Sequence, residues 1–157
     1  MKTIGLIGGM SWESTVTYYQ VINETIKEAL GGLHSAKIIM YSVDFDEIER
    51  CQSSGDWKRS ADILADAARR LEGAGADFIV ICTNTMHKVA PEVRESVSIP
   101  LLHIAEVTAR KLKEAGVTTV KLRTRAKTSA PDLVRKHPET FSLTLAQRIA
   151  RSAVLLV

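Results

Sequence analysis

The chain has 157 residues, 45% of them hydrophobic and 25% charged, which is the size and composition of one ordinary globular domain. No apolar run approaches the roughly 18 residues that span a bilayer, so no membrane segment is expected. Because there are only two cysteines, no Cys-x-x-Cys pair and no histidine cluster, we expect neither a disulfide framework nor a metal site. The apolar start, residues 1–9, is typical of a strand and not of a secretory signal, which favours a cytoplasmic protein.

The net charge of +3 is distributed unevenly. Residues 1–120 hold 13 Lys and Arg against 16 Asp and Glu, whereas residues 121–157 hold 8 against 2. All nine glycines precede residue 121. A basic tail can bind nucleic acid, but this one lacks interleaved glycines and aromatics, so no nucleic-acid partner is expected.

Strands and helices are expected to alternate up to about residue 120. The first predicted elements are a strand over Thr3–Ile7, a helix capped by Ser11 and stopped by Gly31, a strand over Lys37–Val43, a short helix over Asp46–Cys51 and a polar loop over Gln52–Asp56. The next are a helix over Trp57–Glu72, a strand over Phe78–Ile81, a short helix over His87–Ser96 interrupted at Pro91, a fourth strand over Ile99–Ile104, a helix over Glu106–Ala115 and a fifth strand over 117–120. This alternation predicts an α/β fold with a parallel sheet flanked by helices.

The segment after residue 120 breaks that pattern. Basic residues interrupt the expected strand, and no glycine turn follows. Residues 146–157 have the spacing of a modest amphipathic helix, but nothing before them prepares a place for one. We expect this tail to pack poorly.

A glycine turn follows the first strand. Residues 8–13 (GGMSWE) join that strand to the next helix, where glycines allow close backbone approach and a helix N-terminus favours a carboxylate or phosphate. Neither Gly-x-Gly-x-x-Gly nor a Walker lysine is present, so a nucleotide cofactor is not indicated.

Cys82 is the most informative residue, because it falls at the carboxyl end of the buried third strand, where open α/β sheets bind ligands. Thr83, Asn84 and Thr85 follow it with donors and acceptors suited to a small polar molecule. Position alone leaves two interpretations open: a reactive thiol, and a cysteine that only fills space.

The remaining candidates favour structural roles. His87 lies close enough to tune a thiolate or bind a substrate, but capping a helix or facing solvent is the favoured interpretation. His103 is expected to be a partly buried, satisfied residue at the end of a strand. The acidic residues at 44, 46, 47 and 49 are more typical of a solvated turn than of a metal site.

Two separate motifs resemble one family. Residues 8–15 (GGMSWEST) and 82–87 (CTNTMH) closely resemble the aspartate/glutamate racemases, and most of all the bacterial broad-specificity amino-acid racemases. Residues 42–45 (SVDF) and 51–52 (CQ) also lie where that family places them, and the resemblance covers about the first 120 residues. It implies a cofactor-independent racemase with two similar α/β lobes and an active site between them, each lobe presenting one cysteine to the substrate's α-carbon.

The same resemblance implies individual roles. Cys82 is then the first lobe's catalytic acid or base, which suits a thiol because its reference pKa of about 8.5 allows either role. The positions matching the family's substrate-binding residues are Met10, Gln52, Thr83, Asn84 and Thr85. The partner implied is a small amino acid, with no cofactor and no metal.

The chain departs from the family in its second half. The family's second cysteine lies in a Gly-Cys-Thr-Glu segment well beyond residue 157, and the only other cysteine here, Cys51, resembles no catalytic motif. A frameshifted or prematurely ended reading would give this pattern. We therefore expect residues 1–105 to form the first lobe and residues 106–157 to begin an incomplete second lobe that continues as the basic tail.

Impaired racemisation is expected for such a chain. The alternatives are a relative of hydantoin racemase or maleate isomerase, and a non-catalytic one-lobe remnant that only binds an amino acid. Because a missing lobe leaves apolar surface uncovered, a homodimer or another oligomer is also expected.

Overall fold

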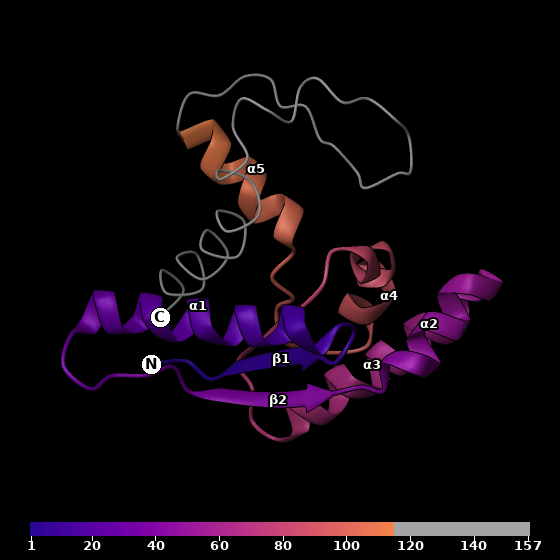
Figure 1. The fold of residues 1–157 in the computed structure, drawn as a ribbon, viewed down its shortest axis with the longest axis horizontal. Helices are drawn as coiled ribbons and strands as arrows, with labels where there is room; N and C mark the ends of the chain where they lie inside the picture. Colours follow the sequence, from indigo (N-terminus) through magenta and orange to yellow (C-terminus); the bar gives the residue numbers. More distant parts are fainter. Residues whose placement is uncertain (115–157) are drawn as a thin grey trace.

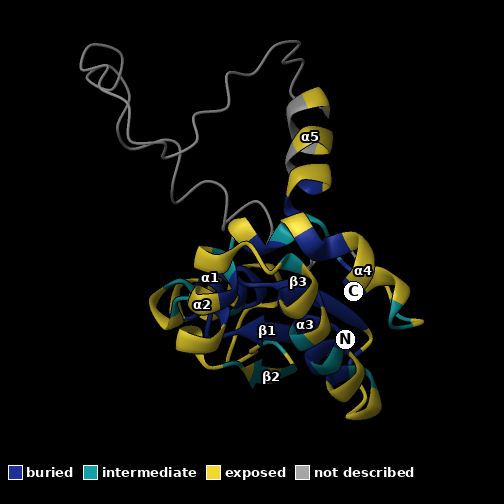
Figure 2. Cartoon of the chain, turned by 90° about the vertical axis from the view of Figure 1, so that its right-hand side faces the viewer, coloured by how far each residue is buried: buried dark blue, intermediate teal, exposed yellow. Residues whose placement is uncertain are grey.

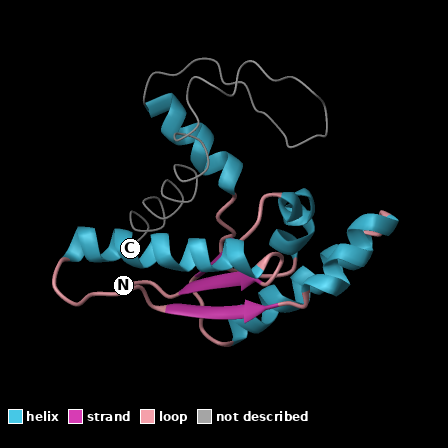
Figure 3. Ribbon diagram, viewed as in Figure 1, coloured by secondary structure: helices cyan, strands magenta, loops and turns pink. Residues whose placement is uncertain are grey.

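Strands and helices alternate along residues 1–114, the part of the chain that the computed structural model describes (Figures 1 and 3). The strands are β1 (Ile4–Gly8), β2 (Ile38–Ser42) and β3 (Phe78–Ile81). The helices are α1 (Trp12–Leu30), α2 (Phe45–Ser54), α3 (Trp57–Gly73), the 3-10 helix η1 (Thr85–Val89), α4 (Ala90–Glu95) and α5 (Ile104–Glu114).

The three strands form one parallel sheet in the order β2-β1-β3. In the register of this sheet, Ile4 of the central strand lies opposite Ile38 of β2 and Phe78 of β3. Because parallel strands end at the same edge, the loops after all three strands lie together there. The predicted fold class, a parallel sheet flanked by helices, is confirmed.

Different helices cover the two faces of the sheet (Figure 1). Ile4 and Leu6 of β1 belong to a cluster with Tyr18 of α1, whereas Ile7 belongs to a cluster with Leu64 of α3. This alternation along the strand follows from the two-residue repeat of β structure. Each face of the sheet therefore has its own apolar core.

Small residues let α3 approach the sheet closely. A Cβ placed at Gly5 would lie 3.0 Å from the Cβ of Ala76 and 3.3 Å from that of Leu71. Ala67 and Ala68 of α3 are both fully buried. The α3 face is thus packed tightly enough that an added methyl group at Gly5 would need a shift of its neighbours.

The caps of α1 lie where they were predicted. The Ser11 hydroxyl accepts a hydrogen bond from the Ser14 N–H at 3.4 Å, which satisfies one of the free amides of the first turn. At the other end, Gly31 has a φ of 73° and its N–H donates to the Lys27 carbonyl. Glycine reaches this left-handed conformation without a steric penalty, so the helix stops there.

Two local predictions were wrong in detail. The polar loop expected over Gln52–Asp56 begins later, because α2 continues to Ser54, whose hydroxyl donates to the Arg50 carbonyl one turn back. Pro91 does not interrupt a helix but lies in the first turn of α4, where its missing N–H leaves no intrahelical bond unmade.

The predicted fourth strand was wrong in extent. Only Leu101 pairs with the sheet, through one parallel bridge to Ile79. Pro100 contributes its carbonyl to the Ile79 N–H at 2.8 Å but has no N–H to continue a ladder. The chain then turns, and α5 begins at Ile104 instead of Glu106. Figure 2 shows α5 projecting away from the sheet, with buried positions near its start.

The predicted fifth strand at 117–120, the basic tail and the amphipathic segment at 146–157 lie outside the described residues. The division at residue 105 into a first lobe and an incomplete second lobe stays a prediction. Among the described residues, none of the helices has the length and apolar character needed to cross a bilayer.

Candidate active site at the carboxyl edge of the sheet

The turn after β1 brings the backbone of two strands unusually close. Gly9 has a φ of +88°, and a Cβ at this position would lie 2.1 Å from the Val43 carbonyl oxygen, just beyond β2. The Val43 N–H in turn donates to the Gly8 carbonyl at 3.0 Å. Only glycine fits both the conformation and the space, so this turn is fixed by sterics as well as by hydrogen bonds.

A buried threonine supports the same turn. The Thr15 hydroxyl accepts the Gly9 N–H at 3.0 Å and donates to the Ser11 carbonyl at 3.3 Å. Ser11 itself has a φ of 87°, the positive-φ non-glycine residue among those described. Strained backbone of this kind is often found at functional sites, where the surrounding contacts hold it in place. Sequence reasoning missed Thr15, although a hydroxyl on the apolar stripe of a helix is an available signal.

Cys82 lies where it was predicted, directly after β3. Its N–H donates to the Ile7 carbonyl at 2.9 Å, which ties it to the central strand. Since Phe78 and Val80 point toward α1, Cys82 points the same way and joins their cluster with Tyr18. The thiol thus belongs to the α1 face of the sheet.

The thiol is closed off from solvent in this conformation. Cys82 has 0% exposure, and desolvation by burial raises the pKa of its thiol to about 12. Tyr18 packs in the same cluster, and burial, followed by the charge of a Cys82 thiolate, raises the pKa of its phenol as well. A thiol with so high a pKa is protonated near neutral pH and is a poor base there. The prediction of a catalytic Cys82 therefore stays a prediction.

The three residues after Cys82 are accessible. Thr83 is partly buried, and Asn84 and Thr85 are exposed at the start of η1. They lie at the carboxyl edge of the sheet, and their role in binding a substrate stays a prediction.

The other two predicted substrate-binding residues lie toward the α3 face. Met10 is buried in the α3-side cluster together with Met86 of η1. The Gln52 side chain extends from α2 and donates its amide N–H to the Met86 sulfur at 3.1 Å. The structure thus brings Met10, Gln52 and Met86 into one neighbourhood, while the Cys82 side chain belongs to the cluster on the opposite face.

His87 serves as a cap, the interpretation favoured from sequence. Its Nε2 accepts the N–H of Ile104, the first residue of α5, at 3.3 Å, and its Nδ1 lies 2.8 Å from the Thr83 carbonyl oxygen. The ring of His103 meets the His87 ring edge-on, with the centroids 4.7 Å apart. Desolvation, opposed by the Thr83 carbonyl and helped by the His103 charge, lowers the pKa of His87 to about 4. Both imidazoles therefore belong to the structure around the start of α5.

Cys51 is not a partner for Cys82 across a common site. It is a buried residue of α2, a helix that packs with α3, and it lies near Arg59. The acidic residues of the same region behave as a solvated turn: Asp44 caps α2, and Glu47 pairs with Arg59 at 2.8 Å. Within residues 1–114, no group of three or more histidine, cysteine or carboxylate side chains is placed to hold a metal ion.

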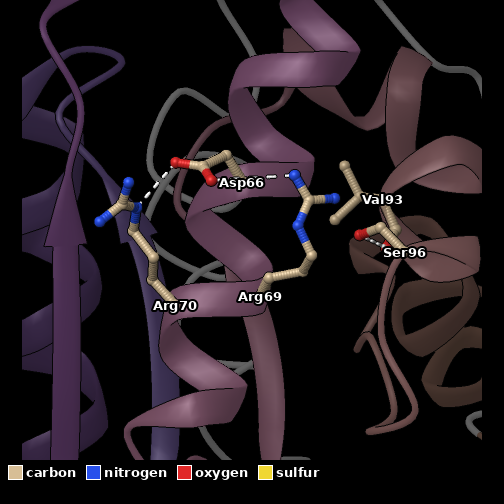
Figure 4. Close-up of polar contacts among 5 residues, drawn as sticks. All are labelled: Asp66, Arg69, Arg70, Val93 and Ser96. Carbon is tan, nitrogen blue, oxygen red and sulfur yellow. Dashed lines mark hydrogen bonds and ion pairs between the residues drawn. The ribbon is translucent and has the colours of Figure 1, made fainter.

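A surface hollow of about 530 Å³ lies between α3 and α4, away from these residues. Figure 4 shows Arg69 and Ser96, two residues of its lining, together with Asp66, which pairs with Arg69 at 3.8 Å and with Arg70 at 2.7 Å. Its lining includes both cationic and anionic side chains but neither Cys82 nor any predicted substrate-binding residue. The hollow and the candidate site are therefore different places.

The described residues form an α/β domain with a glycine turn, a cysteine and hydroxyl and amide side chains at the carboxyl ends of parallel strands, the edge where open α/β sheets commonly bind ligands. The family model of the Asp/Glu/Hydantoin racemases matches residues 7–151. The chain belongs to this family.

Individual relatives agree with that assignment. The chain is 25% identical over 134 residues to the broad specificity amino-acid racemase RacX of Bacillus subtilis (strain 168). This alignment covers 77% of this chain and 54% of RacX. It is 59% identical to a protein from Yersinia pestis whose crystal structure is described as that of a putative Asp/Glu racemase, with a TM-score of 0.73. It is 35% identical to PH1733, an aspartate racemase homologue from Pyrococcus horikoshii OT3, with a TM-score of 0.69. Each match covers 74% of this chain and 50% of the other. The chain thus spans about half the length of these relatives.

Proposed function

We propose that this chain is the first lobe of a cofactor-independent amino-acid racemase, in which Cys82 transfers a proton at the α-carbon of a small amino acid. The supporting observation is the place of Cys82 in a chain of this family: it is the first residue after β3, beside the Gly8–Gly9 turn of the central strand. Inverting a stereocentre needs an acid on one face and a base on the other. A thiol can serve in either role once its environment adjusts its pKa.

The residues around the thiol have separate roles in this proposal. Thr83, Asn84 and Thr85 bind the α-carboxylate and α-ammonium through backbone amides and side-chain oxygens. Met10 and Gln52 contact the rest of the substrate from the α3 side, where Gln52 is already oriented by its bond to Met86. No metal or organic cofactor is required for such a proton transfer.

We further propose that the isolated chain does not complete racemisation. The sequence holds no second cysteine other than Cys51, which lies on α2 beside α3 and not with Cys82. The closed Cys82 thiol, with its pKa raised to about 12, acts as a proton donor and not as a base until it becomes solvated. A one-lobe chain that only binds an amino acid is the second candidate, and the burial of Cys82 favours it.

Proton exchange in deuterated water tests the proposal. The chain is incubated with L- and D-aspartate and L- and D-glutamate, and α-deuterium incorporation is followed by NMR together with optical rotation. We expect slow exchange with one enantiomer, no loss of optical rotation, and no exchange in a Cys82→Ser variant. Cys51→Ser is the matched control and should exchange like the parent chain.

Each other outcome contradicts part of the proposal. Loss of optical rotation by the parent chain would show complete racemisation and overturn the proposed impairment. Binding in ligand-detected NMR without exchange would favour the binding-only candidate. Exchange that persists in Cys82→Ser would remove the cysteine from the mechanism.

A further inference from the structure

One imidazole joins the segment after Cys82 to the start of α5. His87 bonds the Thr83 carbonyl through Nδ1 at 2.8 Å and the Ile104 N–H through Nε2 at 3.3 Å. Thr83 is the neighbour of Cys82 in the chain, and Ile104 is the first residue of the helix that follows. A single side chain therefore bridges these two segments.

The two contacts define the state of the ring. A carbonyl oxygen only accepts, so Nδ1 must carry the proton, and a backbone N–H only donates, so Nε2 must present its lone pair. His87 is thus neutral and held in one tautomer. Protonating Nε2 would place a donor against a donor and break the contact with α5.

A second imidazole acts on the same helix end. The Nδ1 of His103 accepts the N–H of Ala105 at 3.2 Å, so the first two amides of α5 are both satisfied by histidine nitrogens. A helix N-terminus disfavours positive charge nearby. Both accepted hydrogen bonds need an unprotonated ring nitrogen, and positive charge on His103 lowers the pKa of His87.

This helix end belongs to the apolar cluster that contains the thiol. Ile104 is 8% exposed and packs in the same cluster as Cys82 and Tyr18, with Leu102 against it. Tyr18 closes the cluster from α1, a helix bonded to neither imidazole. Displacing the first turn of α5 would therefore remove one of the groups that exclude water from the sulfur, while leaving the sheet intact.

We infer that His87 is a positioning residue that holds the first turn of α5 over the Cys82 thiol, so that the thiol becomes accessible when this contact opens. The meaning of that opening for catalysis rests on the proposed function, because it would convert a closed thiol into a solvated one. The contact itself does not depend on any reaction.

Within residues 1–114, few charged groups surround this contact. In this part of the chain His103 is the titratable group that faces His87, and the other groups that act on it are the Thr83 and Asn84 carbonyls. An exposed ion pair between Arg94 of α4 and Glu106 of α5, at 3.2 Å, is a second link across the same junction. Because it is exposed, we expect it to add little to the closure.

Labelling of Cys82 tests the inference without any turnover. The native chain is treated with 4,4′-dithiodipyridine, and peptide mapping gives separate rates for both thiols, so that Cys51 on α2 is an internal reference. In His87→Phe, which keeps the bulk but removes both bonds, we expect Cys82 to react about tenfold faster. In His87→Gln, whose amide can still donate and accept, the rate should stay closer to that of the parent chain.

A matched control separates local opening from general loss of stability. The Asp56 side chain caps α3 by accepting the Arg59 N–H at 2.9 Å, far from α5 in the chain. Asp56→Ala should destabilise the fold to a similar degree and leave the Cys82 rate unchanged. If it raises the Cys82 rate as much as His87→Phe does, the inference is wrong.

The dependence on pH is specific to an imidazole. Relative to a free thiol at the same pH, labelling of Cys82 in the parent chain should rise by about tenfold between about pH 7 and about pH 5, since opening lets His87 bind a proton. In His87→Gln it should stay flat. A parent chain without this rise contradicts the inference.

Ile104→Ala keeps the inference testable if His87→Phe does not fold. It trims the covering side chain without touching His87 and should also speed labelling. Unchanged labelling in a folded His87→Phe or Ile104→Ala chain would overturn the inference. Absence of amino-acid exchange with the expected labelling would instead overturn only the proposed function.

Discussion

The two faces of the sheet differ in what holds them together. On the α3 face, Leu64, Ala67 and Ala68 are fully buried against β1 and β3, and α4 packs onto α3 beside them. On the α1 face, a smaller cluster contains Tyr18 and the Cys82 thiol and is closed in part by the first turn of α5. The cluster on the α3 face includes no residue of α5. The cluster on the α1 face includes Ile104, so its closure also depends on the position of the first turn of α5.

Surface exposure shows the same difference. Trp12, Val16 and Tyr19, spaced four and three residues apart on α1, are 65%, 55% and 48% exposed. Residues at this spacing share one side of a helix, so they form a continuous apolar stripe that these described residues leave uncovered. The α3 face thus has the larger buried cluster, whereas the α1 side retains apolar surface typical of an interface. This contrast is open to direct tests.

The largest loss of stability is expected at Gly9, in the turn that follows the central strand. In Gly9→Ala the new methyl group would collide with the Val43 carbonyl at a φ of +88°, so we expect a loss of more than ~3 kcal/mol or a failure to fold. Gly73→Ala is the control, because open space surrounds that glycine at the end of α3, and it should be neutral or stabilising by up to ~1 kcal/mol. Urea unfolding measures both, and equal effects would contradict the steric argument.

A cavity on the α3 face should lower stability without opening the other face. Leu64→Ala removes a fully buried side chain and should cost ~3 kcal/mol in unfolding free energy. The labelling rate of Cys82 in the folded state should stay that of the parent chain. If it rises together with the loss of stability, the two faces unfold as one unit and the contrast between them is wrong.

Acid should act on the α1 face through His87. Its pKa is lowered to about 4 in the fold from an unfolded value of 6.5, so the unfolded chain binds this proton more readily. Stability is therefore full above about pH 6.5 and falls as the pH drops toward about 4, by ~2 kcal/mol for this group. Thermal melts across that range measure how the free energy of unfolding depends on pH, and His87→Gln should weaken this dependence. An unchanged pH dependence in this variant would assign the acid sensitivity to other groups.

The smallest effect on stability is expected at the exposed stripe. Val16→Lys should change the unfolding free energy by less than ~0.5 kcal/mol yet weaken self-association, because it places a charge in the middle of the apolar stripe. Sedimentation velocity measures the association. Leu33→Lys is the control, since Leu33 is fully exposed in the turn after α1 and outside the stripe. Equal effects of the two changes would show that general charge and not this surface controls association.

Local signals explain which predictions succeeded. Ser11 and Gly31 act on the helix that they border, so the ends of α1 were readable from neighbouring residues alone. The buried run before Cys82 likewise fixed the end of β3, and with it the edge where a ligand would bind.

The wrong or missing predictions concern contacts between distant segments. Residues 99–104 have a strand composition, but Leu101 alone finds a place in the ladder, because Ile104 is already bonded to His87 as the start of a helix. The sequence left a reactive and a space-filling Cys82 both open, and the burial found in this structure also depends on contacts between distant segments. Its face of the sheet follows from alternation, whereas its exposure depends on Tyr18 and on α5, and composition does not report such packing.

Because β1 is the central strand, it determines where the chain can accept an inserted residue without disturbing the loops at the carboxyl edge of the sheet. The Val43 N–H bonds the Gly8 carbonyl, and the Cys82 N–H bonds the Ile7 carbonyl, so consecutive residues of β1 align both neighbouring loops. Inserting a single residue into β1 would move the side chains on one side of the insertion to the opposite core and shift the register with both neighbouring loops by one residue. The exposed turn over residues 31–35 precedes the bonds of Ala36 to Asn23 and of Lys37 to Ile4, so an insertion there should leave the carboxyl edge of the sheet aligned.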